Sequence, residues 1–231
     1  MTISPIAAAD RLSLPVVETF HSLQGEGLHA GRSAFFIRLA GCGVGCSWCD
    51  TKHSWPQGSH PHRSLAELAG EAATAAIAGA AFVVITGGEP LHHDLSGLCA
   101  SLRQAQQTGL PLPMPLHLET SGVDPLSGRF DWITLSPKLH RPPRSDLLQA
   151  CDELKVVVTA PADLTFAEAM AEQAFQGRSL GADGRRSRPG PALLLQPVWD
   201  DPVAGELTID YVRRHPAWRL SLQSHKWLGL R

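Results

Sequence analysis

The stretch from Leu39 to Thr51, LAGCGVGCSWCDT, constrains the fold of this chain more than any other feature of its sequence. It holds three of the five cysteines, Cys42, Cys46 and Cys49, in a CxxxCxxC spacing. Three thiolates this close together can bind one small inorganic centre. A structural zinc ion or an electron-carrying 4Fe–4S cluster normally takes four protein ligands, so a cluster held by three cysteines leaves one iron open for chemistry.

A zinc site and a disulfide remain open alternatives for the three cysteines. A zinc ion completed by His53 or by a remote residue would use the same thiols. A disulfide would leave the third thiol over, and nothing in the sequence suggests secretion. Gly41, Gly43 and Gly45 favour the cluster, because they let the backbone curl tightly and bring amide groups close to the sulfurs.

Composition limits the kind of protein. A length of 231 residues with 43% hydrophobic and 18% charged residues suits a single globular domain over residues 1–231. The net charge of −2 provides no basic surface for nucleic acid, and no apolar run approaches membrane-spanning length. Residues 1–14 lack the basic and apolar regions of a signal peptide, so we expect a loose leader there and a location in the cytoplasm.

Apolar runs and helical segments alternate through the rest of the chain. The continuous run at 82–86, FVVIT, is typical of a parallel strand buried on both faces. Alternation predicts a parallel sheet with right-handed crossovers, and the few helices favour an incomplete TIM-like β/α barrel. We expect strands at 16–20, 34–39, 82–86, 116–119, 132–135, 154–159, 193–195 and 218–222, and helices at 64–80, 91–108, 164–176 and 203–214.

Local signals predict two helix starts and two buried thiols. Ser64 followed by Glu67 is the pattern of a capping box, and Asp163 is a plausible cap for the helix that follows it. Cys99 and Cys151 stand among apolar neighbours away from the cysteine stretch. We expect both to be core residues, because free cysteine often behaves as a small buried hydrophobe.

Two irregular segments are predicted to be surface loops. Residues 53–63 contain three histidines, His53, His60 and His62, which also fit a metal site. The prolines and the irregular spacing favour a solvated loop instead. Residues 177–190, GRSLGADGRRSRPG, interrupt the alternation of strands and helices, and we expect a solvated surface loop there as well.

Polar groups recur where the predicted strands end. In parallel sheets the carboxyl ends of the strands lie at one edge, where such folds place their sites. A lysine suits the carboxylate of a small ligand, and carboxylates or hydroxyls suit a ribose. The positions are Gly88 of the GGEP turn, Glu119, Ser136, Lys138 and Gln196.

The CxxxCxxC spacing and the GGEP turn together resemble those of the radical S-adenosylmethionine (SAM) enzymes. More specific motifs resemble the family of 7-carboxy-7-deazaguanine synthases, which act in queuosine and 7-deazapurine biosynthesis. The resemblance covers almost the whole chain. It rests on ETFHSLQGEG (18–27), FIRLAGCGVGCSWCDT (36–51), TGGEP (86–90), ETSG (119–122), SPK (136–138), LQP (195–197) and LQSHKWLG (222–229).

The resemblance implies a pterin substrate, 6-carboxy-5,6,7,8-tetrahydropterin. Arg38 would pair with its carboxylate, and a charge inside the apolar run AFFIRL needs a partner if it is buried. Arg231 stands near where relatives often have a proline, so we expect it or the terminal carboxylate to touch the pterin. The implied substrate-binding residues are Leu23, Gln24, Gly25, Glu26, Arg38, Thr86, His225 and Arg231.

The same resemblance implies three cofactors: a 4Fe–4S cluster, SAM and Mg²⁺. Cys42, Cys46 and Cys49 would bind the cluster. Thr51 would offer its hydroxyl to Mg²⁺, which keeps several waters and so needs few protein ligands. The implied SAM-binding residues are Trp48, Cys49, Asp50, Gly88, Glu119, Ser136, Pro137, Lys138 and Gln196.

The implied reaction is a radical ring contraction. One-electron cleavage of SAM would yield a radical that takes a hydrogen atom from C6 of the pterin, and the ring would contract with loss of ammonia. No protein nucleophile is required, because the protein supplies position and shelter from water. The implied partners are a second copy of the chain in a homodimer and a flavodoxin- or ferredoxin-type electron donor, with no nucleic acid or membrane.

Two alternative functions share some of these features. Another small radical SAM enzyme, such as a glycyl-radical activase, would have the cysteines and GGEP but not SLQGEG or SHK. A non-catalytic zinc or iron–sulfur module would not need polar groups at every strand end.

Overall fold

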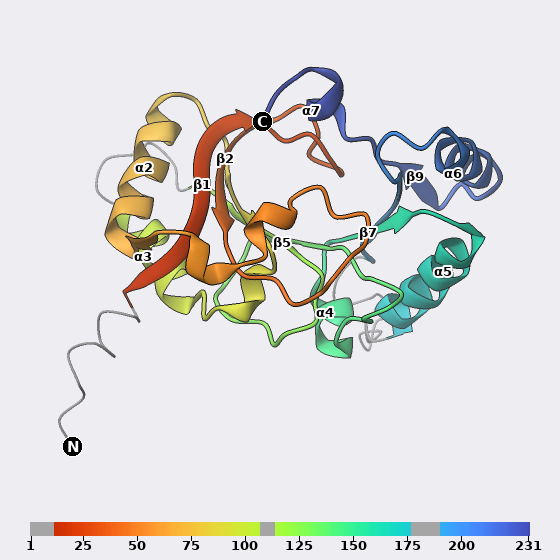
Figure 1. Cartoon of the computed structure of the whole chain (residues 1–231), viewed down its shortest axis with the longest axis horizontal. Coiled ribbons are helices and arrows are strands. Elements are labelled where there is room, and N and C mark those ends of the chain that lie inside the picture. The colour runs from red at the N-terminus through yellow and green to blue at the C-terminus, as the bar shows by residue number, and fades with distance from the viewer. Residues whose placement is uncertain (1–11, 107–113, 177–189) are drawn as a thin grey trace, which may run out of the picture. The chain divides into compact units, whose positions relative to one another are not determined.

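The computed structural model describes residues 12–106, 114–176 and 190–231 (Figure 1). The chain falls into two compact units. Unit 1 covers the described residues of Met1–Leu23, Arg32–Glu119 and Leu126–Asp131, and unit 2 those of Gln24–Gly31, Thr120–Pro125 and Trp132–Arg231. No helix in these described ranges is both long and apolar enough to cross a membrane.

Unit 1 is built on a mixed set of strands. β1 (Ser13–Leu23) pairs antiparallel with β2 (Ser33–Leu39) and with the short β3 (His62–Ser64). β2 pairs in parallel with β4 (Val83–Gly87), and β4 pairs in parallel with β5 (Leu116–Thr120). The carboxyl ends of β2 and β4 therefore lie at the same edge, and the cysteine stretch and the GGEP turn begin there.

Helices in the crossovers pack on these strands. Parallel neighbours need a crossover connection, and α2 (Leu65–Ile77) and α3 (Ser96–Gln106) lie in the two connections that enter and leave β4. The two helices pack together and lie on the same side of β1 and β2 in Figure 1. Short 3₁₀ helices occupy the loops of this unit: η1 (Lys52–Ser54), η2 (Gln57–Ser59) and η3 (Pro90–His92).

Apolar side chains of the strands and helices form the core of unit 1. Ile37 of β2, Ile85 of β4 and Leu68 of α2 are each 0% exposed. Burial of such side chains contributes about 1.5–3 kcal/mol each before entropy is counted. Cys99 is 3% exposed in this core and Cys151 is 0% exposed in unit 2, so the prediction that both are core residues is confirmed.

Unit 2 alternates parallel strands with helices. β6 (Trp132–Leu135), β7 (Glu153–Val158), β8 (Ala192–Pro197) and β9 (Trp218–Leu220) pair in parallel in that order. The helices that follow these strands are α4 (Ser145–Ala150), α5 (Pro161–Gln176), α6 (Pro202–Arg214) and the one-turn α7 (Ser224–Trp227). α5 packs on β7, and α6 packs on β8 and β9.

The predicted capping box of α2 is confirmed. The N–H of Glu67 donates to Ser64 Oγ at 3.2 Å, and the N–H of Ser64 donates to Glu67 Oε2 at 2.9 Å. Asp163 is not the cap of α5, however, because it lies inside the helix. Its carboxylate accepts the N–H groups of Thr159 and Ala160 at 2.7 and 3.0 Å. Asp163 therefore lies in the first turn of α5 and bonds back to the two residues that precede the helix.

Several boundaries differ from those expected. β1 begins at Ser13, inside the range expected to be a leader, and extends to Leu23 because β2 supplies partners along its length. The helix expected over 91–108 is divided into η3 and α3. β3, α4 and α7 were not predicted, because elements of 3, 6 and 4 residues are too short to show a periodic pattern. Residues 1–11, and the expected surface loop apart from Gly190, lie outside the described residues.

Candidate active site

The cysteine loop, residues 40–51, follows β2 directly and belongs to unit 1. Gly41 and Gly45 have φ angles of +102° and +79°, so they take the left-handed backbone that the predicted curl requires. The N–H of Cys49 donates to the carbonyl of Cys46 at 3.2 Å, which closes a turn between the two ligand positions. The loop is therefore a compact curl closed by a hydrogen bond of its own.

The thiols of the cysteine loop have polar neighbours. Trp55 Nε1 donates to Cys49 Sγ at 3.4 Å, and Thr51 Oγ1 lies 3.5 Å from the same sulfur. Burial raises the pKa of the Cys42 thiol, while hydrogen bonds from the backbone of Val44 and Gly45 oppose that rise. Amide groups directed at sulfur are typical of sites that hold iron–sulfur clusters.

The donor set fits a 4Fe–4S cluster in its chemistry and its backbone. The described residues contain no set of three His, Cys, Asp or Glu side chains gathered around one point. The curled backbone and the amides near sulfur support the fit.

The GGEP turn packs directly against the cysteine loop. The N–H of Glu89 donates to the carbonyl of Gly41 at 2.8 Å. A Cβ atom on Gly88 would lie 2.4 Å from that carbonyl oxygen and 2.9 Å from Cβ of Cys42. Only glycine allows this approach, so the turn and the cysteine loop form one structure.

Two histidines after the GGEP turn also hold the cysteine loop, and the sequence alone had not pointed to them. The N–H of Gly43 donates to His92 Nε2 at 2.9 Å. His93 Nε2 lies 2.7 Å from the carbonyl of Ala40 and donates to it, because a carbonyl only accepts. Burial lowers the pKa of His93. The signal in the sequence is the pair of adjacent histidines in LHH, directly after GGEP.

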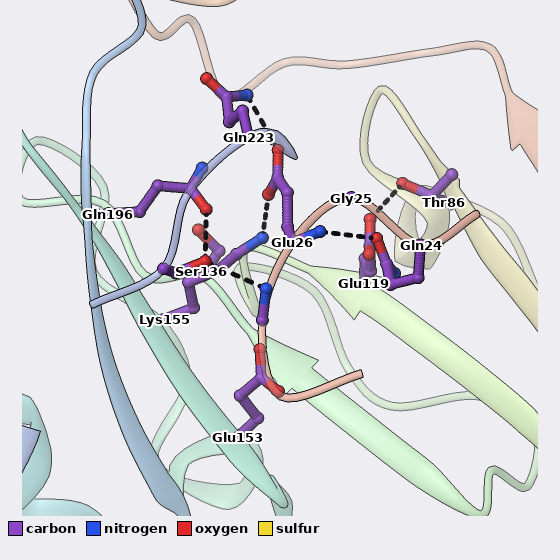
Figure 2. Close-up of polar contacts among 12 residues, drawn as sticks. Gln24, Gly25, Glu26, Thr86, Glu119, Ser136, Glu153, Lys155, Gln196 and Gln223 are labelled. Carbon is purple, nitrogen blue, oxygen red and sulfur yellow. Dashed lines mark hydrogen bonds and ion pairs between the residues drawn. The ribbon is translucent and has the colours of Figure 1, made fainter. Parts of the chain in front are cut away.

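A row of polar side chains crosses the strands of unit 1. The strand register pairs Glu18 with Arg38, and Arg38 with Thr86. Arg38 Nε donates to Glu18 Oε1 at 3.0 Å, and Thr86 Oγ1 donates to Glu119 Oε2 at 3.0 Å (Figure 2). Arg38 thus has the partner that its position in an apolar strand required. Because that bond uses Nε, the two terminal nitrogens form the fork that can pair with a second carboxylate.

The predicted polar residues of unit 2 lie directly after β6, at Ser136 and Lys138, and in the last two residues of β8, at Gln196. Lys138 Nζ donates to Ser136 Oγ at 2.8 Å. Gln196, which is 4% exposed, accepts a hydrogen bond from Ser221 Oγ at 2.8 Å. Pro137 is buried between Ser136 and Lys138.

Residues Gln24–Gly31 form a loop that belongs to unit 2 and is held by distant residues. It is named the substrate loop, because the sequence predicts that Gln24, Gly25 and Glu26 bind the substrate. The N–H of Leu28 donates to Glu153 Oε2 at 2.9 Å, and the N–H of Gly27 donates to Ser221 Oγ at 3.0 Å. The carbonyl of Gly25 accepts the N–H and the hydroxyl of Ser224 at 2.9 and 3.0 Å. β7 and the C-terminal segment therefore determine the backbone path of this loop.

Within the substrate loop, the side chain of Glu26 bonds to two residues of unit 2 from outside the loop (Figure 2). One carboxylate oxygen pairs with Lys155 of β7, and the other accepts Gln223 Nε2 at 2.8 Å. Burial works to raise the pKa of Glu26, but Lys155, Gln223 and the charge on His225 outweigh it and lower the pKa from 4.5 to about 2. Glu26 is therefore an anion at neutral pH and does not transfer protons there.

His225 lies against the substrate loop. A Cβ atom on Gly25 would lie 2.0 Å from His225 Nδ1, so the absence of a side chain at Gly25 makes room for the ring. The Glu26 N–H donates to Gln24 Oε1 at 3.2 Å. Gln24, Gly25, Glu26 and His225 therefore form one group within unit 2.

The remaining expected site residues are more dispersed. Leu23 ends β1 in unit 1 and is 39% exposed. On the cysteine loop, Trp48 is half-buried and Asp50 is exposed. Arg231 is exposed.

Sequence reasoning missed the residues that hold the substrate loop, namely Glu153, Lys155, Ser221 and Gln223. The signal was present in β7, whose sequence ELKVVV places two charges in an apolar strand. Buried charges need partners, so Glu153 and Lys155 require them just as Arg38 does. The identity of the partners could not be read locally, because they lie more than 100 residues away along the chain.

Comparison with known proteins identifies relatives of this chain. Residues 36–137 match the model of the Radical SAM superfamily. A curated 7-carboxy-7-deazaguanine synthase from Prochlorococcus marinus is 54% identical over 220 residues, covering 94% of this chain and 98% of that protein. One from Synechocystis sp. is 46% identical over 231 residues and covers 100% of both. The crystal structure of QueE from Escherichia coli matches with a TM-score of 0.70 at 30% sequence identity, covering 97% of this chain and 100% of that chain.

The fold and the cysteine loop thus define a radical SAM protein, and the predicted incomplete β/α barrel is confirmed by the structural match. This superfamily binds a 4Fe–4S cluster and SAM, and a non-catalytic zinc module does not fit it. More narrowly, the chain belongs to the family of 7-carboxy-7-deazaguanine synthases. A glycyl-radical activase does not fit that membership.

Proposed function

We propose that this chain converts 6-carboxy-5,6,7,8-tetrahydropterin into 7-carboxy-7-deazaguanine with loss of ammonia, in 7-deazapurine and queuosine biosynthesis. One observation carries the proposal beyond the superfamily. The two family-specific motifs, SLQGEG and SHK, are hydrogen-bonded to each other through Ser224 and the carbonyl of Gly25. Motifs that far apart in the sequence have no local reason to meet, so their contact supports a shared role in binding the substrate.

The bonds already made by the site residues limit what each can offer a pterin. Thr86 has committed its hydroxyl proton to Glu119, so its oxygen can accept from a substrate N–H. Gln24 accepts the Glu26 N–H with its side-chain oxygen, and its NH₂ group is a donor of the kind that a pterin edge needs. Arg38 keeps its terminal fork for the substrate carboxylate, because Glu18 binds Nε. The proposed substrate-binding set is completed by Leu23, Gly25, Glu26, His225 and Arg231.

The cofactor roles extend the proposal. When bound, the cluster and SAM supply the one-electron chemistry that removes a hydrogen atom from the substrate. Cys42, Cys46 and Cys49 bind the cluster, and Thr51 offers a hydroxyl to Mg²⁺. SAM contacts Trp48, Cys49, Asp50, Gly88, Glu119, Ser136, Pro137, Lys138 and Gln196.

The remaining expectations rest on the resemblance. We propose that residues 1–231 act as one radical SAM domain, since a relative matches over 100% of the chain. We further propose a homodimer in the cytoplasm that takes electrons from a flavodoxin- or ferredoxin-type donor. Size measurement by light scattering checks the dimer, and a monomer at micromolar concentration would contradict it.

Anaerobic turnover tests the proposed reaction. Reconstituted enzyme is mixed with SAM, dithionite, Mg²⁺ and carboxytetrahydropterin, and the products are followed by mass. Carboxydeazaguanine together with 5′-deoxyadenosine is the expected result. Deoxyadenosine without carboxydeazaguanine would leave a radical SAM enzyme but reject this substrate. Neither product, from protein with a full cluster, would reject the catalytic proposal.

A further inference from the structure

Two charged residues stand on one face of β7. Side chains alternate along a strand, so Glu153 and Lys155 point to the face opposite Leu154 and Val156. All four residues are buried, and the side chain of Lys155 is 7% exposed. A buried ammonium costs several kcal/mol of desolvation unless it is paired. Lys155 therefore depends on a partner close at hand.

That partner is Glu26 on the substrate loop. The Glu26 carboxylate joins Lys155 to Gln223, which precedes α7. Gln223 in turn accepts a hydrogen bond from Lys226 Nζ at 3.1 Å, which directs its NH₂ group toward Glu26. Lys155, Glu26, Gln223 and Lys226 thus form a continuous chain of contacts from β7, through the substrate loop, to the C-terminal turn.

Stability alone does not require this ion pair. Buried ion pairs can often be replaced by apolar groups of similar volume with no loss of stability. What an ion pair adds is a defined geometry. Here the geometry joins the two segments that carry Gln24, Gly25 and His225, so a lost contact would displace both segments together.

We propose that Lys155 is a positioning residue that acts through Glu26 to hold the substrate loop and the C-terminal turn in the geometry that binds substrate. This inference rests on the proposed function for its kinetic test only. Lys155 makes no contact with the substrate and takes no part in SAM cleavage.

A double-mutant cycle tests the inference in the reconstituted enzyme. Lys155→Met removes the charge at similar length, and Glu26→Gln removes the opposite charge. Each single variant is expected to lose about 100-fold in kcat/KM for the pterin, mainly through KM, since small displacements of positioning groups have effects of this size. The double variant is expected to be no worse than either single variant, because neither charge is then left buried without its partner. Losses that multiply would overturn the inference.

Two further variants separate positioning from a general structural role. Lys155→Arg keeps the charge and is expected to recover most of the activity. Arg103→Met breaks a more exposed ion pair with Asp131 in unit 1, and its KM is expected to stay unchanged. Formation of 5′-deoxyadenosine without pterin should stay within about twofold in Lys155→Met. A fall in that rate, or a Lys155→Arg variant as impaired as Lys155→Met, would overturn the inference.

Hydrogen exchange provides a readout that does not depend on the substrate. In Lys155→Met, the amides of Gly27, Leu28 and Ser224 are expected to exchange faster together, while those of the cysteine loop stay unchanged. Arg103→Met should show neither effect. Unchanged exchange at all three amides would overturn the inference even if the enzyme acts on another substrate. A wild-type enzyme that rejects the pterin but shows this coupled exchange would reject only the proposed function.

Discussion

The cysteine loop and the substrate loop are both glycine-rich segments that follow a strand, but they are held in different ways. The cysteine loop is closed by contacts such as Cys46 to Cys49 and Trp55 to Cys49, within a few residues along the chain. From outside, it is held by His92 and His93, which directly follow the GGEP turn, at separations of 49 and 53 residues. The substrate loop bonds to Glu153, Lys155, Ser221 and Gln223, at separations of 125 to 197 residues. The first loop can be recognised from its own sequence, whereas the second is defined by the rest of unit 2.

The difference suits what each loop is proposed to bind. A cluster needs three ligands in a fixed relation, and a short curled segment supplies them at little cost in chain entropy. A pterin needs donors, acceptors and charge from several directions. Only a loop in contact with distant segments can collect them, so changes in the two loops should produce separable defects.

Loss of any ligand of the cysteine loop is expected to have the largest effect. Cys42→Ala, Cys46→Ala or Cys49→Ala should abolish both the visible absorbance of the cluster and all formation of 5′-deoxyadenosine, because three ligands are the minimum that holds the cluster. Iron content and product mass measure this. Cys151→Ala is the matched control, since that thiol is buried in unit 2. A variant of Cys42 that kept a full cluster and normal turnover would show that Cys42 is not a ligand of the cluster.

Adding one methyl group to each loop should separate the two defects. In Gly88→Ala the Cβ meets a backbone carbonyl at 2.4 Å, so the cysteine loop must shift and cluster content should fall. In Gly25→Ala the Cβ meets the ring of His225 at 2.0 Å, so the ring must move. We expect about a 100-fold loss in kcat/KM for the pterin in that variant, with the cluster intact.

Gly58→Ala is the matched control for both variants, because nothing lies within 4 Å of its Cβ position. It should behave as wild type in cluster content and in KM. Loss of the cluster in Gly25→Ala would show that the two loops are not independent.

Acid should destabilise the contacts of the substrate loop through Glu26. The pKa of Glu26 is lowered from 4.5 to about 2 in the folded chain, so its ionised form stabilises the fold above pH 4.5. That contribution to the free energy of unfolding is lost as the pH falls from 4.5 toward 2, because the unfolded chain then binds a proton at Glu26 that the folded chain does not bind. The melting temperature of Glu26→Gln should therefore fall less between pH 6 and pH 3 than that of the wild type. Parallel curves would mean that Glu26 is not ionised within a buried pair.

The smallest effect is expected at the N-terminal cap of α2. Ser64→Ala removes the cap of α2 and should cost about 1 kcal/mol of unfolding free energy. Denaturant titration measures it, and Ser64→Asp, which can still cap the helix, is the control. Cluster content and KM should stay unchanged. A change in either would show that α2 transmits strain to the site.

The sequence alone predicted much of the site, but unevenly. The ligand cysteines, the GGEP turn and the α2 capping box were read from adjacent residues, because each depends on hydrogen bonds or ligands within a few positions. Asp163 was assigned to the wrong helix position, because a carboxylate just before a helix and one in its first turn both bond to nearby backbone amides. Here Asp163 lies in the first turn and bonds back to the amides of Thr159 and Ala160, which precede α5. The need of Arg38 for a partner was predicted, but Glu18 was not named.

Short spacing along the chain encodes part of the chemistry: three thiols on a curled loop, a glycine turn and the alternation of strands and helices. The way in which the substrate loop is held, with Lys155 and Gln223 bonded to Glu26 and His225 against Gly25, depends on the tertiary structure. The physical reason is that the sequence shows which charges and amides need a partner once they are buried, but not which residue that partner is. Strand pairing and the path of the chain determine the partner, and they bring together residues more than 100 positions apart.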